Sequence, residues 1–323
     1  MLIDLHCDTI YSLWEGKVEG DLASSSLSVD RKKLEGTGSA AQCFALFTPM
    51  YEHLGERDRN KSPWQVLNEL HDRFASETEK AGIPQMIKVS DLSDGSIHAV
   101  LTTEEGASIE GDISRLEILK EWGVKIFGLT WNHENELAYP NTEGSPFAFD
   151  RQLMEKGLKD KGFEAVEECS RLGIIVDVSH LNDGGFMDVT SIVKGPFVAT
   201  HSNARSVTEV TRNLTDEQLK ILADHGGVTG LNFCSAFLSD DKKGESRISD
   251  MVRHVMHIYK TAGEDVLAIG TDFDGIDGKL EIPSSDKMYL LHDALIDAGL
   301  SERILDKMWY ENALRVFKSA ENG

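Results

Sequence analysis

The sequence predicts an α/β protein folded as a (β/α)8 barrel of the TIM type. Short apolar runs rich in β-branched residues alternate with longer amphipathic stretches along all 323 residues, a pattern typical of βαβ units and a parallel sheet. Eight such runs can be counted, which is the number that closes this kind of barrel. No GxGxxG follows the first run, and its absence disfavours an open dinucleotide-binding sheet.

Each apolar run is short enough to be one buried strand. The eight expected strands are Leu2–Leu5, Ala40–Phe47, His98–Thr102, Lys125–Leu129, Ile174–Val178, Phe197–Thr200, Val228–Asn232 and Val266–Ile269. Amphipathic stretches between them predict helices, and several end in Gly, the usual residue at a helix C-terminus. The clearest helical stretches are 64–82, 113–123, 162–173, 215–227 and 248–263, and residues 302–323 predict a closing helix.

Nothing along the chain predicts a domain boundary. We find no internal repeat and no low-complexity linker, and the polar, turn-rich segments 52–62 and 139–146 are too short to be linkers. Segments of this kind suit loops over one face of a barrel. We therefore expect residues 1–323 to form a single domain.

Composition excludes several classes of partner. The chain has 33 Lys and Arg against 55 Asp and Glu, a formal net charge of -22, which argues against nucleic acid and anionic membranes. We see no signal peptide and no apolar run of the ~20 residues that a transmembrane helix requires. The four cysteines form no CxxC pair, so reduced thiols and a cytoplasmic protein are expected.

Six polar side chains follow the ends of five expected strands. In a (β/α)8 barrel these strand ends open onto one face, where active sites of the fold are assembled. One such residue alone is ordinarily a turn residue or a helix cap, but carboxylates gathered at one mouth repel each other unless divalent cations are bound. The six residues are His6 and Asp8 after the first strand, Glu105 after the third, His180 after the fifth, His201 after the sixth and Asp272 after the eighth.

This residue set predicts a binuclear metal site at the C-terminal face of the strands. Imidazole and carboxylate ligands together suit zinc, although manganese or cobalt accepts the same set. Glu105 is the expected bridging carboxylate because its strand lies between the two groups of ligands. Two ions ~3.5–4 Å apart hold a hydroxide that attacks a carbonyl at neutral pH.

The sequence resembles the membrane (renal) dipeptidase family, peptidase family M19 of the amidohydrolase superfamily, in the form of a soluble bacterial-type member. The resemblance covers nearly the whole chain, through DLHCDT, EEGASI, GIIVDVSHL, FVATHSNARSVTEVTRNLTDEQL, GTDFDG and ENALRVF. It implies two zinc ions per chain and hydrolysis of free dipeptides by a hydroxide that bridges the ions. Family members tolerate a D-residue at the C-terminal position, so L-Xaa-D-Xaa dipeptides are expected substrates.

The resemblance also implies a role for each residue. One metal is expected on His6, Asp8 and Glu105, and the other on Glu105, His180 and His201, which makes Glu105 both ligand and catalytic residue. Asp272 is expected to take the proton of the hydroxide and pass it to the departing amine. Arg212, in TEVTRN, is expected to hold the C-terminal carboxylate of the substrate. From the residues alone, a surface salt bridge is the favoured interpretation of Arg212.

One position departs from the family pattern. Members of the family carry a His directly after the Leu-Thr of the fourth strand, where it polarises the scissile carbonyl, but here the stretch reads LTWNHENELA. Trp131 occupies the matching place, and either His133 or Asn132 is expected to contact the substrate instead. Cys234, in LNFCSAF, is expected at the same mouth, either against the substrate or as a buried thiol.

Two other functions remain open from the sequence. The same metal centre suits hydrolysis of another small amide, such as an N-acyl amino acid or a lactam, and it also suits a non-catalytic metal-dependent binding protein. The expected partners are a small dipeptide and a second copy of the chain in a homodimer, although no segment identifies an interface. Neither nucleic acid nor a membrane is expected to bind.

Overall fold

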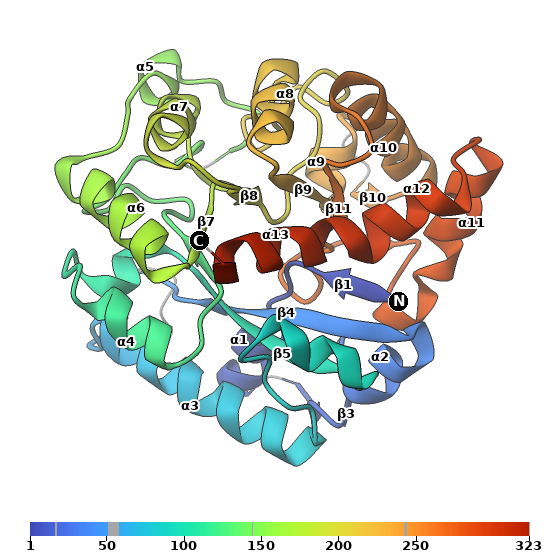
Figure 1. The fold of residues 1–323 in the computed structure, drawn as a ribbon, viewed down its shortest axis with the longest axis horizontal. Helices are drawn as coiled ribbons and strands as arrows, with labels where there is room; N and C mark the ends of the chain where they lie inside the picture. Colours follow the sequence, from blue (N-terminus) through green and yellow to red (C-terminus); the bar gives the residue numbers. More distant parts are fainter. Residues whose placement is uncertain (17, 51–57, 144, 242–243, 323) are drawn as a thin grey trace.

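A closed barrel of parallel strands forms the centre of the protein (Figure 1). The computed structural model describes residues 1–16, 18–50, 58–143, 145–241 and 244–322. The barrel order is β1-β11-β9-β8-β7-β6-β5-β4, and β4 pairs with β1 to close the ring. The barrel strands are β1 (Leu2–Asp4), β4 (Ser39–Phe47), β5 (His98–Glu104), β6 (Ile126–Gly128), β7 (Ile175–Asp177), β8 (Val198–Ala199), β9 (Val228–Leu231) and β11 (Leu267–Ile269). The predicted (β/α)8 barrel is confirmed, and each expected strand is present within two residues of its predicted ends.

The barrel strands are buried on both faces, because helices cover the outside and side chains fill the inside. In β4, eight consecutive residues from Ser39 to Leu46 are buried, which explains its nearly unbroken run of small and apolar residues. Its pairing with β5 runs from Ala41 opposite His98 to Phe47 opposite Glu104. This register places Glu104 at the C-terminal rim of the barrel.

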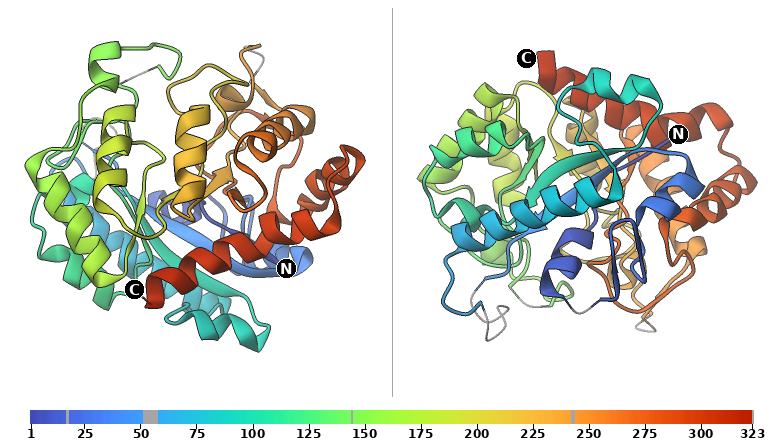
Figure 2. Two further views of the ribbon diagram at one scale, coloured as in Figure 1. Left: turned by 45° about the horizontal axis from the view of Figure 1, so that its top comes forward. Right: turned by 90° about the horizontal axis from the view of Figure 1, so that it is seen from below.

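Helices surround the barrel as an outer layer (Figures 1 and 2). They are α1 (Thr9–Glu15), α2 (Arg31–Thr37), α3 (Pro63–Ala81), α4 (Arg115–Glu121), α5 (Arg151–Met154), α6 (Asp160–Leu172), α7 (Asp183–Ile192), α8 (Asp216–Asp224), α9 (Ser235–Leu238), α10 (Ile248–Ala262), α11 (Tyr289–Asp297), α12 (Glu302–Asp306) and α13 (Asn312–Asn322). Short 3₁₀ turns are η2 (Val89–Asp94), η3 (Gly106–Ile109) and η4 (Ser285–Lys287), and two small sheets pair β2 (Gly20–Asp21) with β3 (Ser24–Ser25) and β10 (Glu245–Ser246) with β12 (Lys279–Leu280).

Local sequence signals set the ends of these helices. Thr215 and Gln218 form a capping box at the start of α8, and Gly173 ends α6 in the left-handed conformation. Both signals are those expected of helix boundaries. The predicted closing helix differs in one respect: a π-helical turn, η5 (Lys307–Glu311), separates α12 from α13.

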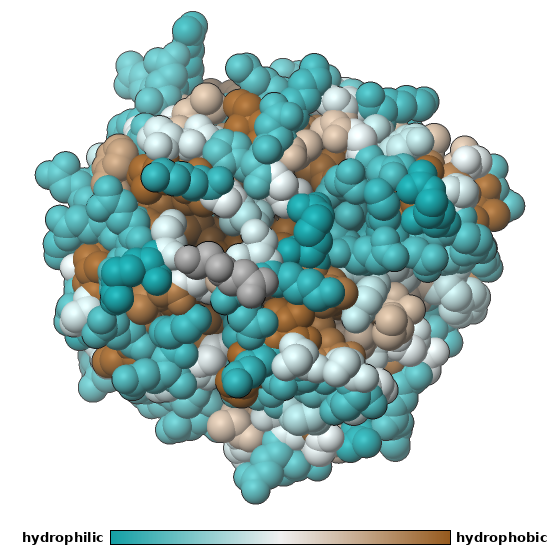
Figure 3. All heavy atoms as spheres, viewed as in Figure 1, coloured by the Kyte–Doolittle hydropathy of each residue, from teal (hydrophilic) through white to brown (hydrophobic). Residues whose placement is uncertain are grey.

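The last helix closes the end of the barrel where the strands begin. Ala313, Val316 and Phe317 of α13 are buried in one apolar cluster with residues inside the barrel, among them Ile3 and Val198. Figure 1 shows α13 crossing this end, and Figure 3 shows that the same face is mostly hydrophilic, with separate hydrophobic patches between the polar side chains. Because this end is closed by apolar packing, the opposite end is left for a functional site. None of the described helices has the length and apolarity needed to cross a membrane.

Candidate metal centre and active site

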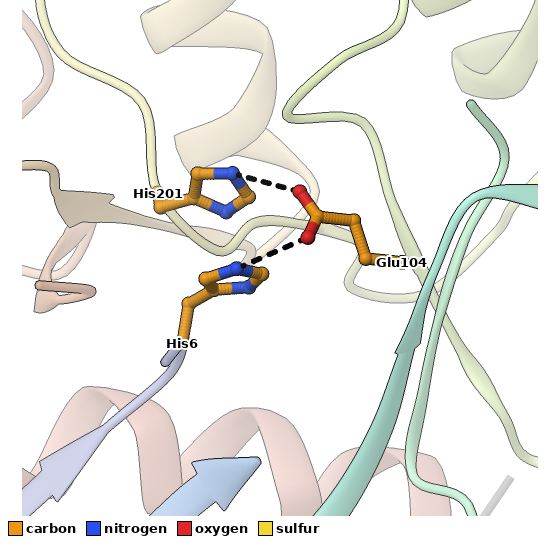
Figure 4. A group of neighbouring side chains, drawn as sticks. All are labelled: His6, Glu104 and His201. Carbon is orange, nitrogen blue, oxygen red and sulfur yellow. Dashed lines mark ion pairs between the residues drawn. The ribbon is translucent and has the colours of Figure 1, made fainter. Parts of the chain in front are cut away.

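Glu104, the last residue of β5, lies among three histidines at the C-terminal end of the barrel, and Figure 4 shows it with two of them, His6 and His201. Its Oε2 is 3.5 Å from Nε2 of His6, and its Oε1 is 2.9 Å from Nε2 of His180 and 3.5 Å from Nε2 of His201. All four side chains are buried. Residues from β5 and from the segments after β1, β7 and β8 therefore meet around one carboxylate.

The structure corrects the expectation that Glu105 supplies this carboxylate. The side chain of Glu105 accepts hydrogen bonds from the Ala107 amide at 2.8 Å, the Trp131 amide at 3.1 Å and Asn135 Nδ2 at 2.6 Å. These partners lie in the segments after β5 and β6, and the backbone leaves the extended conformation at Glu105, with φ 91° and ψ 103°, so Glu105 faces away from the histidines when Glu104 faces them. Burial raises the pKa of Glu105 to about 7.

Two further carboxylates lie beside His6. Oδ2 of Asp8 is 3.5 Å and Oδ1 of Asp272 is 3.8 Å from His6 Nε2. Asp272 adopts the left-handed conformation, with φ 63°, which Asp tolerates better than most residues. Asn232 Nδ2 donates to Oδ2 of Asp272 at 2.9 Å, so the other oxygen of Asp272 remains directed to His6.

The potential ligand atoms form two overlapping groups. One atom each from His6, Glu104 and His201 lie within 4.8 Å of one another, and so do atoms from His6, Asp8 and Asp272. The two groups share His6, and together they offer enough ligand atoms for two ions.

Burial and mutual repulsion raise the pKa values of Glu104 and Asp272 in the absence of a cation. Burial raises the pKa of Glu104 to about 7, and the charges of Asp8 and Asp272 raise it further against the opposing effect of His6. Burial likewise raises the pKa of Asp272 to about 6, with His6 opposing and Asp8 adding to the rise. A divalent cation would favour the ionised form of both groups.

His6 differs in charge from the other two histidines. Burial opposes a charge on His6, but Glu104 and Asp8 outweigh it and hold the pKa of His6 well above its ordinary value. Burial, together with the nearby positive charges of Arg212 and His6, holds the pKa values of His180 and His201 well below the ordinary value. His180 and His201 are therefore neutral imidazoles, the form that binds metals.

The hydrogen bonds of these histidines fit a metal centre. Nδ1 of His180 is 3.0 Å from Oδ1 of Asn132, an acceptor only, so Nδ1 carries the proton and Nε2 carries the lone pair. Nε2 of His180 lies 3.0 Å from Nε2 of His201. Nε2 of His6 and Oδ1 of Asp8 are buried and make no hydrogen bond to any described residue. Buried nitrogen and oxygen atoms without a hydrogen-bond partner are available to bind cations.

Two matching pairs of Asp and Thr hold the strand ends together. Asp177 Oδ2 accepts from Thr200 Oγ1 at 2.5 Å, and Thr200 Oγ1 is also 2.8 Å from Nδ1 of His201. Asp4 Oδ2 accepts from Thr271 Oγ1 at 2.7 Å, and Thr271 directly precedes Asp272. These residues were not predicted from the sequence, although an Asp stands two positions before His6 and another stands three positions before His180.

A cavity of about 650 Å³ opens over the centre. Asp8, Glu104, His180 and Asp272 line it together with Arg212, Cys234 and the aromatic rings of Tyr11, Phe47, Trp131 and Phe237. The pKa of Cys234 is raised to about 11 by burial and by Asp272, so its thiol is protonated at neutral pH. The cavity has the size range of small-molecule sites and mixes apolar walls with a few polar groups.

Arg212 is buried at this cavity rather than exposed in a surface salt bridge, being 2% accessible. Its Nη1 donates to the carbonyl of Ser179, and its Nη2 is 3.2 Å from Nε2 of His180. The guanidinium lies 5.0 Å from the centre of the Phe237 ring. No described carboxylate is within ion-pair distance, and Nε makes no hydrogen bond to a described residue. Burial lowers the pKa of Arg212, so its charge gains from an anionic ligand.

The segment after β6 places its three candidate residues differently. Trp131 and Asn132 line the cavity, and the Trp131 ring lies 4.9 Å from the ring of Phe47. His133 packs beside Trp131, with 5.5 Å between ring centres, and is not among the described residues of the cavity wall. Asn132 thus lines the cavity and also contacts His180. The contact with His180 was not predicted from the sequence.

Comparison with known proteins agrees with this geometry. Residues 1–323 match the family described as membrane dipeptidase, peptidase family M19. An uncharacterized Klebsiella pneumoniae protein from the pqqA 5′ region is 34% identical over 262 residues, 79% of this chain and 95% of that protein. An uncharacterized dipeptidase of Schizosaccharomyces pombe is 30% identical over 231 residues, 71% of this chain and 54% of that protein.

A solved structure is similar over nearly the entire chain. It is a metallo peptidase from Rhodobacter sphaeroides, liganded with a phosphinate mimic of the dipeptide L-Ala-D-Ala. The TM-score is 0.86 at 26% identity, and the similarity covers 99% of both chains. The barrel and the loops that carry the centre therefore share their arrangement with a metallopeptidase.

Proposed function

Because the chain belongs to the membrane dipeptidase family, peptidase family M19, and is a metallo-dipeptidase, we propose that it cleaves free L-Xaa-D-Xaa dipeptides with two zinc ions. The observation that carries the proposal is the position of Glu104 between His6, His180 and His201, under a cavity that also holds Arg212. The similar R. sphaeroides enzyme with its L-Ala-D-Ala mimic supports the substrate class. A cytoplasmic location and a homodimer remain predictions from the sequence.

The ligands divide into two sets that share one residue. His6 and Asp8 would hold one ion, His180 and His201 would hold the other, and Glu104 would serve both sets. When bound, the two ions supply Lewis acidity toward the scissile carbonyl and make a water molecule acidic enough to react at neutral pH. The protonated Nδ1 atoms of His180 and His201, held by Asn132 and Thr200, leave each Nε2 with the lone pair that would bind an ion.

Asp272 carries the proton transfers. Its Oδ2 is held by Asn232, while its Oδ1 faces the centre. Burial places its pKa near 6, in the range that suits a residue that both accepts and donates a proton near neutrality. Asp272 takes a proton from the attacking water and returns it to the nitrogen of the departing amino acid.

Arg212 binds the C-terminal carboxylate of the dipeptide. The guanidinium is fixed by Ser179 and the Phe237 ring and has an unused Nε. It lies beside His180, 3.2 Å from Nε2, so it marks one end of the site at a short distance from the ions. A substrate that extends beyond one residue at that end has no free carboxylate there, which explains a restriction to dipeptides.

Replacing Arg212 by Met is expected to lower kcat/KM for L-Ala-D-Ala by ~10–100-fold, because a hydrogen bond to a charged group contributes ~1.5–3 kcal/mol. For the C-terminal amide of the same dipeptide, kcat/KM is expected to fall by much less, since the amide carries no charge. Steady-state kinetics on both substrates measure the difference. Arg205→Met is the control, because Arg205 pairs with Asp183 rather than lining the cavity. Equal losses on acid and amide substrates would contradict the assignment.

Metal content and turnover together test the proposed function. We expect about two zinc ions per chain, cleavage of L-Ala-D-Ala, loss of cleavage after chelation and recovery on adding zinc. Comparison with L-Ala-L-Ala gives the preference at the C-terminal residue, and reconstitution with manganese or cobalt tests the choice of metal. Two bound ions without cleavage of any dipeptide would instead indicate another small amide as substrate. A chain that binds no divalent metal would overturn the proposal.

A further inference from the structure

Glu105 is a buried, strained residue for which the proposed reaction has no use. Its backbone has φ 91° and ψ 103°, a region that residues other than glycine adopt at a cost of ~1–3 kcal/mol. Its side chain is 0% exposed, and no described cation lies within ion-pair distance. Strain and a buried carboxylate both cost stability, so the contacts of Glu105 must offset them.

All three hydrogen bonds of the carboxylate go to the loops beside the centre. Oε1 accepts from the amide of Ala107 and from Asn135 Nδ2, at 2.8 and 2.6 Å. Oε2 accepts from the amide of Trp131 at 3.1 Å. Glu105 thus bridges the rim of β5 to the segment that follows β6.

Asn135, which binds Glu105, also forms hydrogen bonds within the segment after β6. Asn135 Nδ2 also donates to the carbonyl of Leu129 at 2.9 Å, and its Oδ1 accepts from the amides of Leu137 and Ala138. A Cβ on Gly106 would lie 2.4 Å from the Leu129 carbonyl oxygen, so the two loops touch through their backbones. Only glycine allows this approach next to Glu105.

The hydrogen bond from Trp131 connects Glu105 to the metal centre. Trp131 precedes Asn132, whose Oδ1 is 3.0 Å from Nδ1 of His180. We propose that Glu105 is a positioning residue that holds residues 131 and 132 in place, so that Asn132 fixes the imidazole of His180 with Nε2 toward Glu104. The inference rests on the proposed function only in treating His180 as a metal ligand.

Glu105→Gln separates the bond to Trp131 from the other two. Glutamine has one acceptor oxygen, and placing it at the Oε1 position keeps the bonds from Ala107 and Asn135. The amide NH₂ then faces the Trp131 amide, and that hydrogen bond is lost. Glu105→Gly is the second variant, since glycine adopts φ 91° without strain and removes both acceptor oxygens, and with them all three hydrogen bonds, even where the Gln variant folds poorly.

Hydrogen exchange of the metal-free protein gives a readout that needs neither zinc nor activity. In both variants we expect faster exchange in peptides that cover residues 129–138, with exchange elsewhere unchanged. In the zinc-loaded protein we expect about 10-fold weaker binding of the ion that His180 would hold, because losing the partner that orients a metal-ligating His costs ~10–100-fold. Competition with a chelator measures that affinity.

Glu77→Gln is the matched control, because Glu77 is also buried, accepts from the Leu22 amide at 2.8 Å and lies on α3. It is expected to lower the melting temperature without changing exchange at 129–138 or zinc affinity. Unchanged exchange at 129–138 in both Glu105 variants would overturn the inference, and so would faster exchange with unchanged zinc affinity. A wild-type protein without zinc or turnover would refute the proposed function, while the exchange data would still decide whether Glu105 holds the loop.

Discussion

Replacing Glu104 by Gln is expected to remove at least one zinc ion per chain and to abolish detectable cleavage of L-Ala-D-Ala. Among the described residues, Glu104 is the carboxylate within ion-pair distance of His6, His180 and His201 together. Glutamine keeps the shape of the side chain but has no charge and only one acceptor oxygen, so it cannot serve two cations at once. Metal analysis after dialysis and an activity assay measure the two losses.

The neighbouring residue provides the control. Glu105→Gln is expected to retain two zinc ions at saturating zinc, because the side chain of Glu105 faces Ala107, Trp131 and Asn135 rather than the histidines. The pair of variants therefore discriminates between two adjacent carboxylates. If Glu105→Gln lost both ions while Glu104→Gln kept them, Glu105 would be the bridging ligand, as the sequence suggested.

Replacing Asp272 by Asn is expected to lower kcat by ~10²–10⁴-fold, the usual contribution of general acid–base catalysis. Zinc content is expected to stay at two, because the five ligands proposed for the ions are unchanged. KM is expected to change little, since a group that acts only in the transition state contributes little to substrate binding. Stopped-assay kinetics and metal analysis of the same preparation measure all three quantities.

The second Asp of the same segment serves as the comparison. Asp274 accepts from Thr9 Oγ1 at 2.6 Å and from the Ser28 amide at 2.7 Å, contacts that join the loop to α1 and to the segment after β3. Asp274→Asn is expected to lower the melting temperature, and its effect on kcat is expected to be much smaller than that of Asp272→Asn. Loss of one zinc ion from Asp272→Asn would instead make Asp272 a metal ligand, as its distance to His6 and Asp8 permits.

The fold was predictable because it depends on a pattern that the sequence repeats. Parallel strands buried on both faces leave nearly continuous apolar runs, as Ala40–Phe47 illustrates, and amphipathic helices separate them. Once eight strands were counted, the common polarity of a barrel placed His6, His180, His201 and Asp272 at one mouth. No knowledge of side-chain packing was needed for that step.

Which side chains meet at the mouth was decided only by the tertiary structure. The sequence placed the end of the third strand at Thr102, but β5 continues to Glu104, and it is Glu104, not Glu105, whose side chain faces the histidines. A surface salt bridge was the favoured interpretation of Arg212 from the sequence alone, but packing against Phe237 and Ser179 buries this residue. The sequence by itself determined the strands, their polarity and the chemical types at their ends. The direction of each side chain depends on register and on contacts between distant segments, such as Asn132 with His180, which exist only once the barrel has closed.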